Sequence, residues 1–182
     1  MTISAYHFDQ NEWFILVTLL LMLTLVFRLP RRFPFSISTL IYVFCFAISI
    51  TADLVIGAPP LDLYDINDTP KYSLSDFFTW NLYAPFGYLF LYVYDRNRIR
   101  GISMLLYIVI CACSAVGFEW LTIKAGIFKY KGWSLAYSFP VYLLVLCLYL
   151  LFFHMVKQGF RKTKLRIAKP PAAYDERHDA RQ

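Results

Sequence analysis

Five long apolar runs divide the chain, and short polar or charged stretches separate them. The runs cover about residues 13–29, 35–56, 77–94, 102–123 and 134–156. About 20 consecutive apolar residues in a helix are needed to cross the hydrocarbon core of a bilayer, which is about 30 Å thick. The pattern therefore predicts an all-α fold, a polytopic membrane helix bundle with five transmembrane helices.

Proline and charge mark the boundaries of the runs. Pro30 and Pro34 bracket the first turn, because proline removes a backbone hydrogen bond from a helix. The third run is the least apolar, since it contains Asn81 and Pro85. The basic turn 96–100 that follows supports its crossing, because without that crossing the basic C-terminal tail would lie outside.

The distribution of Lys and Arg sets the orientation of the bundle. Fourteen of the eighteen basic residues follow the first, third and fifth runs. Positively charged segments stay in the cytoplasm, so we expect the N-terminus outside and the C-terminus inside. Lys124, Lys129 and Lys131, in the loop before the fifth run, go against this rule.

Composition leaves no room for a separate soluble domain. The chain is 59% hydrophobic and 16% charged, whereas soluble domains are about 45–50% apolar and about 25% charged. We therefore expect residues 1–156 to form the bundle and 157–182 a basic, partly disordered cytoplasmic tail. The candidate contacts of this tail with anionic headgroups, each worth about 1 kcal/mol, are Lys157, Arg161, Lys162, Lys164 and Arg166.

Known catalytic and metal-binding motifs are missing from the sequence. It contains no glycine-rich phosphate loop, no Gly-x-Ser-x-Gly and no His-Glu-x-x-His, and its three histidines are far apart. The cysteines fall in the middle of the apolar runs and are expected to act as small packing residues: Cys45, Cys111, Cys113 and Cys147. We expect no catalytic residue, metal site or cofactor. Nucleic-acid binding is not indicated, because the basic residues follow the ends of the runs.

Aromatic and small residues have ordinary explanations in a membrane bundle. The four tryptophans would lie near the outer interface, as a one-sided aromatic belt: Trp13, Trp80, Trp120 and Trp133. The small residues of 111–117 predict a closely packed helix face. Glu119 follows on that face, whereas the Leu-, Phe- and Val-rich first run is expected at the periphery of the bundle.

Polar residues of four runs are predicted to lie at one depth. At about 1.5 Å per residue, Asp53, Asn81, Glu119 and Ser138 are about 5–7 Å below the outer ends of their helices. Tyr142 continues the face of Ser138 inward. These groups either reach interfacial water, with Glu119 pairing to a lysine of the next loop, or converge on a small outward-facing pocket in which Asp53 and Glu119 carry charge or share a proton.

A resemblance to known proteins is carried by the third, fourth and fifth runs. Its residues are Tyr83-Ala-Pro-Phe-Gly-Tyr88, Glu119-Trp120, Lys124, Gly126, Phe128, Tyr130, Trp133, Tyr137-Ser138 and Tyr142. In these the chain resembles small uncharacterised five-span membrane proteins of Bacillus-type, often spore-forming, Gram-positive bacteria. The resemblance implies a bacterial plasma membrane and brings no activity with it.

Three functions remain open on the sequence alone. The first is a non-enzymatic plasma-membrane protein that acts in interaction, assembly or envelope maintenance, with a membrane-protein partner. The alternative is a carrier or binding protein for a small solute, ion or lipid, favoured by polar groups between helices and by Pro85 and Pro140 within runs. The third is a lipid-modifying membrane enzyme with Asp53 and Glu119 as acid and base.

Overall fold

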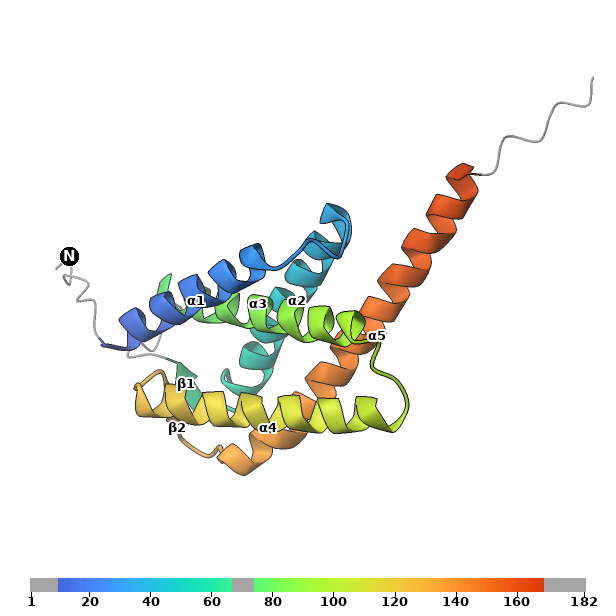
Figure 1. Ribbon diagram of the computed structural model, residues 1–182. Coiled ribbons are helices and arrows are strands. Elements are labelled where there is room, and N and C mark those ends of the chain that lie inside the picture. Colours follow the sequence, from blue (N-terminus) through green and yellow to red (C-terminus); the bar gives the residue numbers. More distant parts are fainter. Residues whose placement is uncertain (1–9, 67–73, 169–182) are drawn as a thin grey trace, which may run out of the picture.

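The computed structural model describes residues 10–66 and 74–168, and it contains five helices and two short strands there (Figure 1). Their bounds are α1 Gln10–Arg28, α2 Phe35–Ile56, β1 Tyr64–Ile66, α3 Leu74–Arg96, α4 Ile102–Lys124, β2 Phe128–Tyr130 and α5 Leu135–Ala168. Every helix begins within three residues of its predicted run. Four of them, α1, α2, α4 and α5, are long and apolar enough to cross a membrane.

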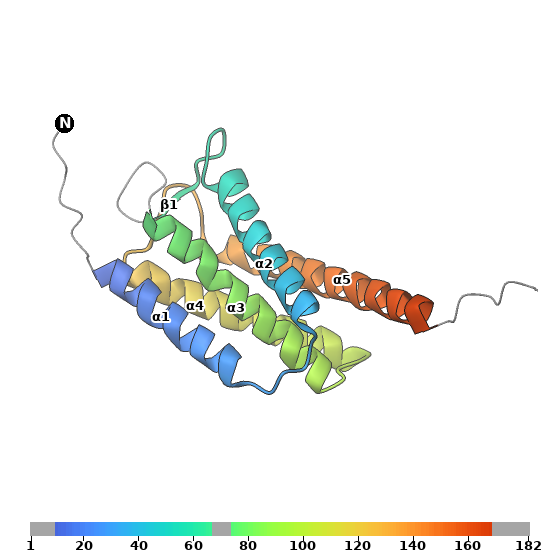
Figure 2. The same ribbon diagram turned by 90° about the horizontal axis from the view of Figure 1, so that it is seen from above.

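Helix α3, which contains the least apolar of the five runs, lies in the middle of the bundle. It packs against α1, α2 and α5, and Figure 2 shows it between α1 on one side and α2 on the other. Leu82, Ala84 and Leu91 are at most 3% exposed. Because its side chains face other helices, α3 needs little apolar outer surface, and this explains the low hydropathy of the third run.

Helix α1 packs on α3 with one face only. Its buried residues are Asn11, Ile15 and Leu19, which are spaced by one helical turn. On the other side, Leu20 and Leu21 are more than 60% exposed. This is the peripheral position that the first run predicts.

Helices α2 and α3 approach closely at a glycine. The buried residues of α2 recur at every fourth position: Ile37, Ile41, Cys45, Ser49 and Asp53. A Cβ added to Gly87 of α3 would lie 2.4 Å from the sulfur of Cys45. A hydrogen at this position therefore allows the two helices to pack.

The small residues of α4 pack less closely than predicted. Ala112 is fully buried, but Cys113 and Ser114 are exposed, and a Cβ on Gly117 would meet no atom within 4 Å. On the face that leads to Glu119, Ala112 is buried and Cys111 and Ala115 are half-buried, so the close packing predicted there is confirmed only in part. Part of this face lines open space instead.

Two strands join the loops at one end of the bundle. β1 and β2 form an antiparallel pair in which Tyr64 lies opposite Tyr130. We call this pair the ribbon, and the end where it lies the ribbon end. The carbonyl of Leu63 accepts backbone hydrogen bonds of 3.0–3.1 Å from the three residues that follow β2. Lys131 binds Asp62 and Asp65, both at 2.9 Å, and its hydrogen bonds to these carboxylates raise its pKa.

At the opposite end of the bundle, two salt bridges share one aspartate. Asp95 at the end of α3 binds Arg32 and Lys157, each at 2.5 Å. Beyond this point α5 continues through Ala168 and projects past the other helices (Figures 1 and 2). The helix is longer than the run 134–156, because the basic residues after Val156 are good helix formers. The predicted disordered segment after Pro171 lies outside the described residues.

Candidate functional site

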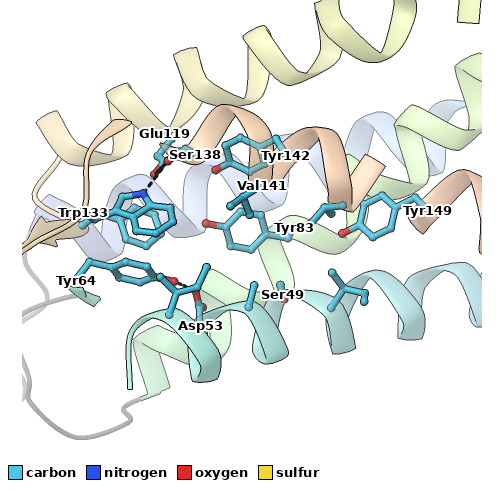
Figure 3. Close-up of a pocket in the computed structure, with 15 residues that line it drawn as sticks. Ser49, Asp53, Tyr64, Tyr83, Glu119, Trp133, Ser138, Val141, Tyr142 and Tyr149 are labelled. Atoms are coloured by element: carbon cyan, nitrogen blue, oxygen red, sulfur yellow. Dashed lines mark hydrogen bonds between the residues drawn. The ribbon is translucent and has the colours of Figure 1, made fainter. Parts of the chain in front are cut away.

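A small chamber lies beneath the ribbon, where α2, α3, α4 and α5 meet (Figure 3). Its volume is about 80 Å³. Since a water molecule takes about 30 Å³ in the liquid, the chamber has room for two or three waters or one small chemical group. The side chains that matter for its chemistry are Asp53, Tyr64, Tyr83, Glu119, Trp133, Ser138, Tyr142 and Tyr149.

Asp53 supplies the first carboxylate, from the last turns of α2. Its Oδ1 accepts a hydrogen bond of 2.6 Å from the hydroxyl of Tyr64, and its Oδ2 accepts one of 2.5 Å from Nε1 of Trp80. Its exposed fraction is 9%. Both oxygens thus have a protein donor, as a buried carboxylate requires.

Glu119 supplies the second carboxylate, from α4. Its Oε1 accepts hydrogen bonds from the hydroxyls of Tyr130, at 2.5 Å, and Ser138, at 2.8 Å. Trp133 in turn donates its Nε1–H to Oγ of Ser138 at 2.9 Å. The other oxygen, Oε2, is buried and has no hydrogen-bond partner among the described residues, although Glu119 is only 7% exposed.

One strand pair serves both carboxylates. Tyr64 and Tyr130 lie directly opposite each other in the ribbon, so their side chains leave the same face. Tyr64 donates to Asp53 and Tyr130 donates to Glu119. Burial and the neighbouring carboxylate raise the pKa of each tyrosine well above its usual value, so both phenols stay protonated donors.

Aromatic rings form much of the remaining wall. Figure 3 shows Tyr83 and Tyr142 with their hydroxyls directed toward the acidic end, and Tyr149 further along the helices. Tyr83 interacts electrostatically with both carboxylates. Tyr142 interacts electrostatically with Glu119 and its hydroxyl lies close enough to that carboxylate for a weak hydrogen bond, but no hydrogen bond of good geometry reaches Oε2 from the described residues.

Four of the five residues proposed from the sequence as a polar layer line this chamber: Asp53, Glu119, Ser138 and Tyr142. The expected convergence of Asn81 is wrong. Its amide donates to the carbonyl of Phe77 and accepts from the hydroxyl of Tyr42. Depth along a helix does not fix the direction of a side chain, and the face of α3 toward the carboxylates carries Trp80 and Tyr83 instead.

Several residues of the site were not expected from the sequence. Trp80 and Trp133 were assigned to an aromatic belt, yet their indole N–H groups donate within the site. Trp13 and Trp120 are 59% and 48% exposed, as belt residues would be. The signal for Tyr64 and Tyr130 is the alternation of apolar and polar residues in 64–66 and 128–130, which is typical of strands.

The basic residues proposed for headgroup binding lie at the opposite end. Lys157, Arg161 and Lys162 line a cleft of about 480 Å³ together with the turn between α3 and α4. Lys164 is exposed, and the side chain of Arg166 is outside the described part of the chain. Binding of anionic headgroups there stays a prediction.

Within residues 10–66 and 74–168, no cluster of His, Cys, Asp and Glu side chains is arranged to hold a metal ion. Comparison of the chain with protein families, with curated proteins and with solved structures finds no match. The fold and the site therefore define the class by themselves. It is an all-α protein with membrane-length helices and a buried, acidic, aromatic-walled chamber.

Proposed function

We propose that this protein binds a small organic ammonium group in the chamber, as a membrane binding protein or carrier rather than an enzyme. The observation that carries the proposal is the buried Oε2 of Glu119, to which no side chain or backbone group in the described part of the chain donates a hydrogen bond. A buried acceptor left in this way costs about 1–3 kcal/mol, and more when it is charged. A bound donor would remove that cost.

The charge of the lining selects the kind of donor. Two carboxylates, Asp53 and Glu119, interact with each other across the chamber, and none of the described residues that line it is Lys, Arg or His. Like charges in a buried space favour a cationic ligand or a shared proton. A cation with N–H groups would supply both the positive charge and the missing donor.

The aromatic wall favours an ammonium group over a metal ion. Hard cations take six or more oxygen ligands, whereas most carboxylate oxygens here already accept protein hydrogen bonds. The aromatic side chains of Tyr83, Tyr142 and Trp133 line the chamber instead. Aromatic rings combined with carboxylates suit organic ammonium ions, because each contact of a desolvated cation with a ring is worth about 2 kcal/mol.

The setting that we propose is a bacterial plasma membrane. In it α3 crosses together with the four more apolar helices, the N-terminus lies outside, and the C-terminus lies in the cytoplasm. The clustering of Arg32, Asp95 and Lys157 at the end away from the ribbon supports this orientation. The basic part of α5 would then contact anionic headgroups.

A structural role is the rival, and one observation favours it. The hydrogen bonds of Tyr64 and Tyr130 fasten the ribbon to α2 and α4 through the same carboxylates. In that case the protein would be an interaction, assembly or envelope component whose carboxylates bind nothing. The two functions make different predictions for conservative substitutions of Glu119.

Titration of the purified protein with methylammonium, followed by tryptophan fluorescence, tests the proposal, since Trp80 and Trp133 lie at the carboxylates. We expect saturable binding that Glu119→Gln weakens at least tenfold, about 1.4 kcal/mol, with little change in melting temperature. Asp62→Asn removes an exposed carboxylate of the ribbon end and should bind normally.

Binding unchanged in Glu119→Gln would contradict the proposal. If Glu119→Gln and Glu119→Ala instead lose folded protein equally, the carboxylate is structural. These outcomes separate the two functions, because the Gln side chain keeps the shape of Glu while it removes the charge and replaces one acceptor oxygen by an NH2 donor.

A further inference from the structure

A second cavity adjoins the chamber. It lies between α3, α4 and α5 and has a volume of about 410 Å³, within the range of about 300–1,000 Å³ that is usual for ligand sites. Apolar and aromatic side chains form almost all of its surface, among them Phe86, Phe90, Phe118 and Leu146. We call this cavity the groove.

The groove and the chamber are adjacent and share part of their walls. Tyr83, Tyr142, Val145 and Tyr149 line both of them. The acidic groups lie at the ribbon end of this joint space, and the rest of it follows the apolar parts of the helices. The space is therefore amphipathic along its length, with a charged end and an apolar body.

Small residues on α4 keep the groove open. Cys111, Ser114 and Ala115 line it where larger side chains would fill it. Ser114 is exposed on the surface of the bundle, so the groove reaches the side of the bundle as well as the chamber. In a membrane this side would face hydrocarbon, and a chain could enter from the bilayer.

From the adjacency of an acidic chamber and an apolar groove we infer that the ligand is a long-chain amine, a lipid-like amphiphile with one hydrocarbon chain. The inference rests on the function proposed above and names the class of compound. The ammonium group donates to Oε2 of Glu119 in the chamber, and the chain lies in the groove. A doubly charged or large polar compound would leave the apolar body of the site without a partner.

Photolabelling of the protein in phosphatidylcholine nanodiscs tests the inference. The probe is hexadecylamine with a diazirine in the middle of its chain. We expect its label on residues of the groove, such as Phe86, Phe90 and Phe118, found by mass spectrometry of peptides. The corresponding long-chain alcohol, which carries no charge, should label these residues at least fivefold less.

Two cysteines on α4 give a matched pair of variants. Cys111 lines the groove, whereas Cys113 is exposed and does not. Cys111→Phe should reduce labelling of the groove at least fivefold, and Cys113→Phe should leave it unchanged. Ala115→Leu is the second filling variant, to be used if Cys111→Phe does not fold.

Titration with methylammonium distinguishes binding of an ammonium group in the chamber from binding of a hydrocarbon chain in the groove. The filling variants should still bind methylammonium, because they do not alter the carboxylates. If methylammonium binds but the label is spread over the outer faces of α1 and α4, or is insensitive to both filling variants, the ligand is not a long-chain amine. If neither compound binds to the wild type, the proposed function itself is wrong.

Discussion

The two buried carboxylates differ in how completely their oxygens are used. Among the residues that the structure describes, donors reach both oxygens of Asp53 but only one oxygen of Glu119. We therefore regard Asp53 as an anchor that also contributes negative charge, and Glu119 as the residue that meets the ligand. This difference between the two carboxylates cannot be read from the sequence, because it depends on tyrosines that come from distant loops.

The tyrosines of the ribbon lead to a prediction for alkaline pH. Burial first, and then the nearby carboxylate, raise the pKa of Tyr64 and Tyr130 above the usual value of about 10. A raised pKa means that the folded state holds the proton more tightly than the unfolded state. The resulting stability is complete below about pH 10 and is lost as the pH rises further.

We expect the melting temperature in mild detergent to fall above about pH 10, and less steeply in Tyr64→Phe and Tyr130→Phe. At pH 7 each substitution removes one donor from a buried carboxylate and should cost about 1–3 kcal/mol. Tyr137→Phe, on an exposed tyrosine of α5, is the control. The variant that carries both substitutions is the decisive case. If its melting temperature falls above about pH 10 as much as that of the wild type, other groups cause the transition.

Counting residues along helices predicted part of the site and failed for the rest. The depth of Asp53, Glu119 and Ser138 places them in one layer, and the structure brings them together. The same count placed Asn81 there, although its side chain hydrogen-bonds to Tyr42 of α2. Depth is a one-dimensional quantity, whereas the direction of a side chain depends on which face of its helix is packed.

At the scale of the elements, long helices were predictable and short strands were not. An apolar run of about 20 residues has few alternatives to a helix, because every backbone group in a membrane needs a partner. A strand of three residues gives only one short alternation of apolar and polar residues, and β1 and β2 pair where their loops meet at one end of the bundle. The central place of α3 explains its composition, since a helix that is surrounded by other helices can carry polar and aromatic residues.

Packing between α2 and α3 gives a prediction with an internal control. Gly87→Ala places a methyl group against Cys45 and Tyr149, and this overpacking should cost about 1–3 kcal/mol. Gly117→Ala adds the same group to α4, where no described atom beyond the helix's own backbone lies within 4 Å. It should stabilise the helix by about 0.5–1 kcal/mol, because alanine loses less backbone entropy than glycine.

Thermal unfolding in mild detergent measures both variants under the same conditions. The two changes in the free energy of unfolding should have opposite signs. This comparison is informative because both positions lie inside helices, so the change in helix propensity is the same at both. Equal effects at Gly87 and Gly117 would contradict the close approach of α2 and α3.

At the scale of the whole molecule, the acidic chamber and the basic cleft lie at opposite ends of the helices. The chamber and the ribbon lie at one end, and the cleft with Lys157, Arg161 and Lys162 lies at the other. If basic segments stay in the cytoplasm, the chamber lies near the outer surface. A long-chain amine would then reach it from the outer leaflet.

Cysteine labelling in intact cells tests this orientation. In a variant without its four cysteines, a single cysteine replaces either Leu61, an exposed residue of the ribbon end, or Asn97, an exposed residue of the turn after α3. A maleimide that cannot cross membranes should label the first in intact cells and the second only after permeabilisation. Both positions avoid the chamber and the ion pair of Asp95, so neither substitution disturbs the contacts that support the fold. Labelling of the cysteine at position 97 in intact cells would invert the topology. The acidic chamber would then face the cytoplasm, and the basic part of α5 would lie outside, against the charge rule.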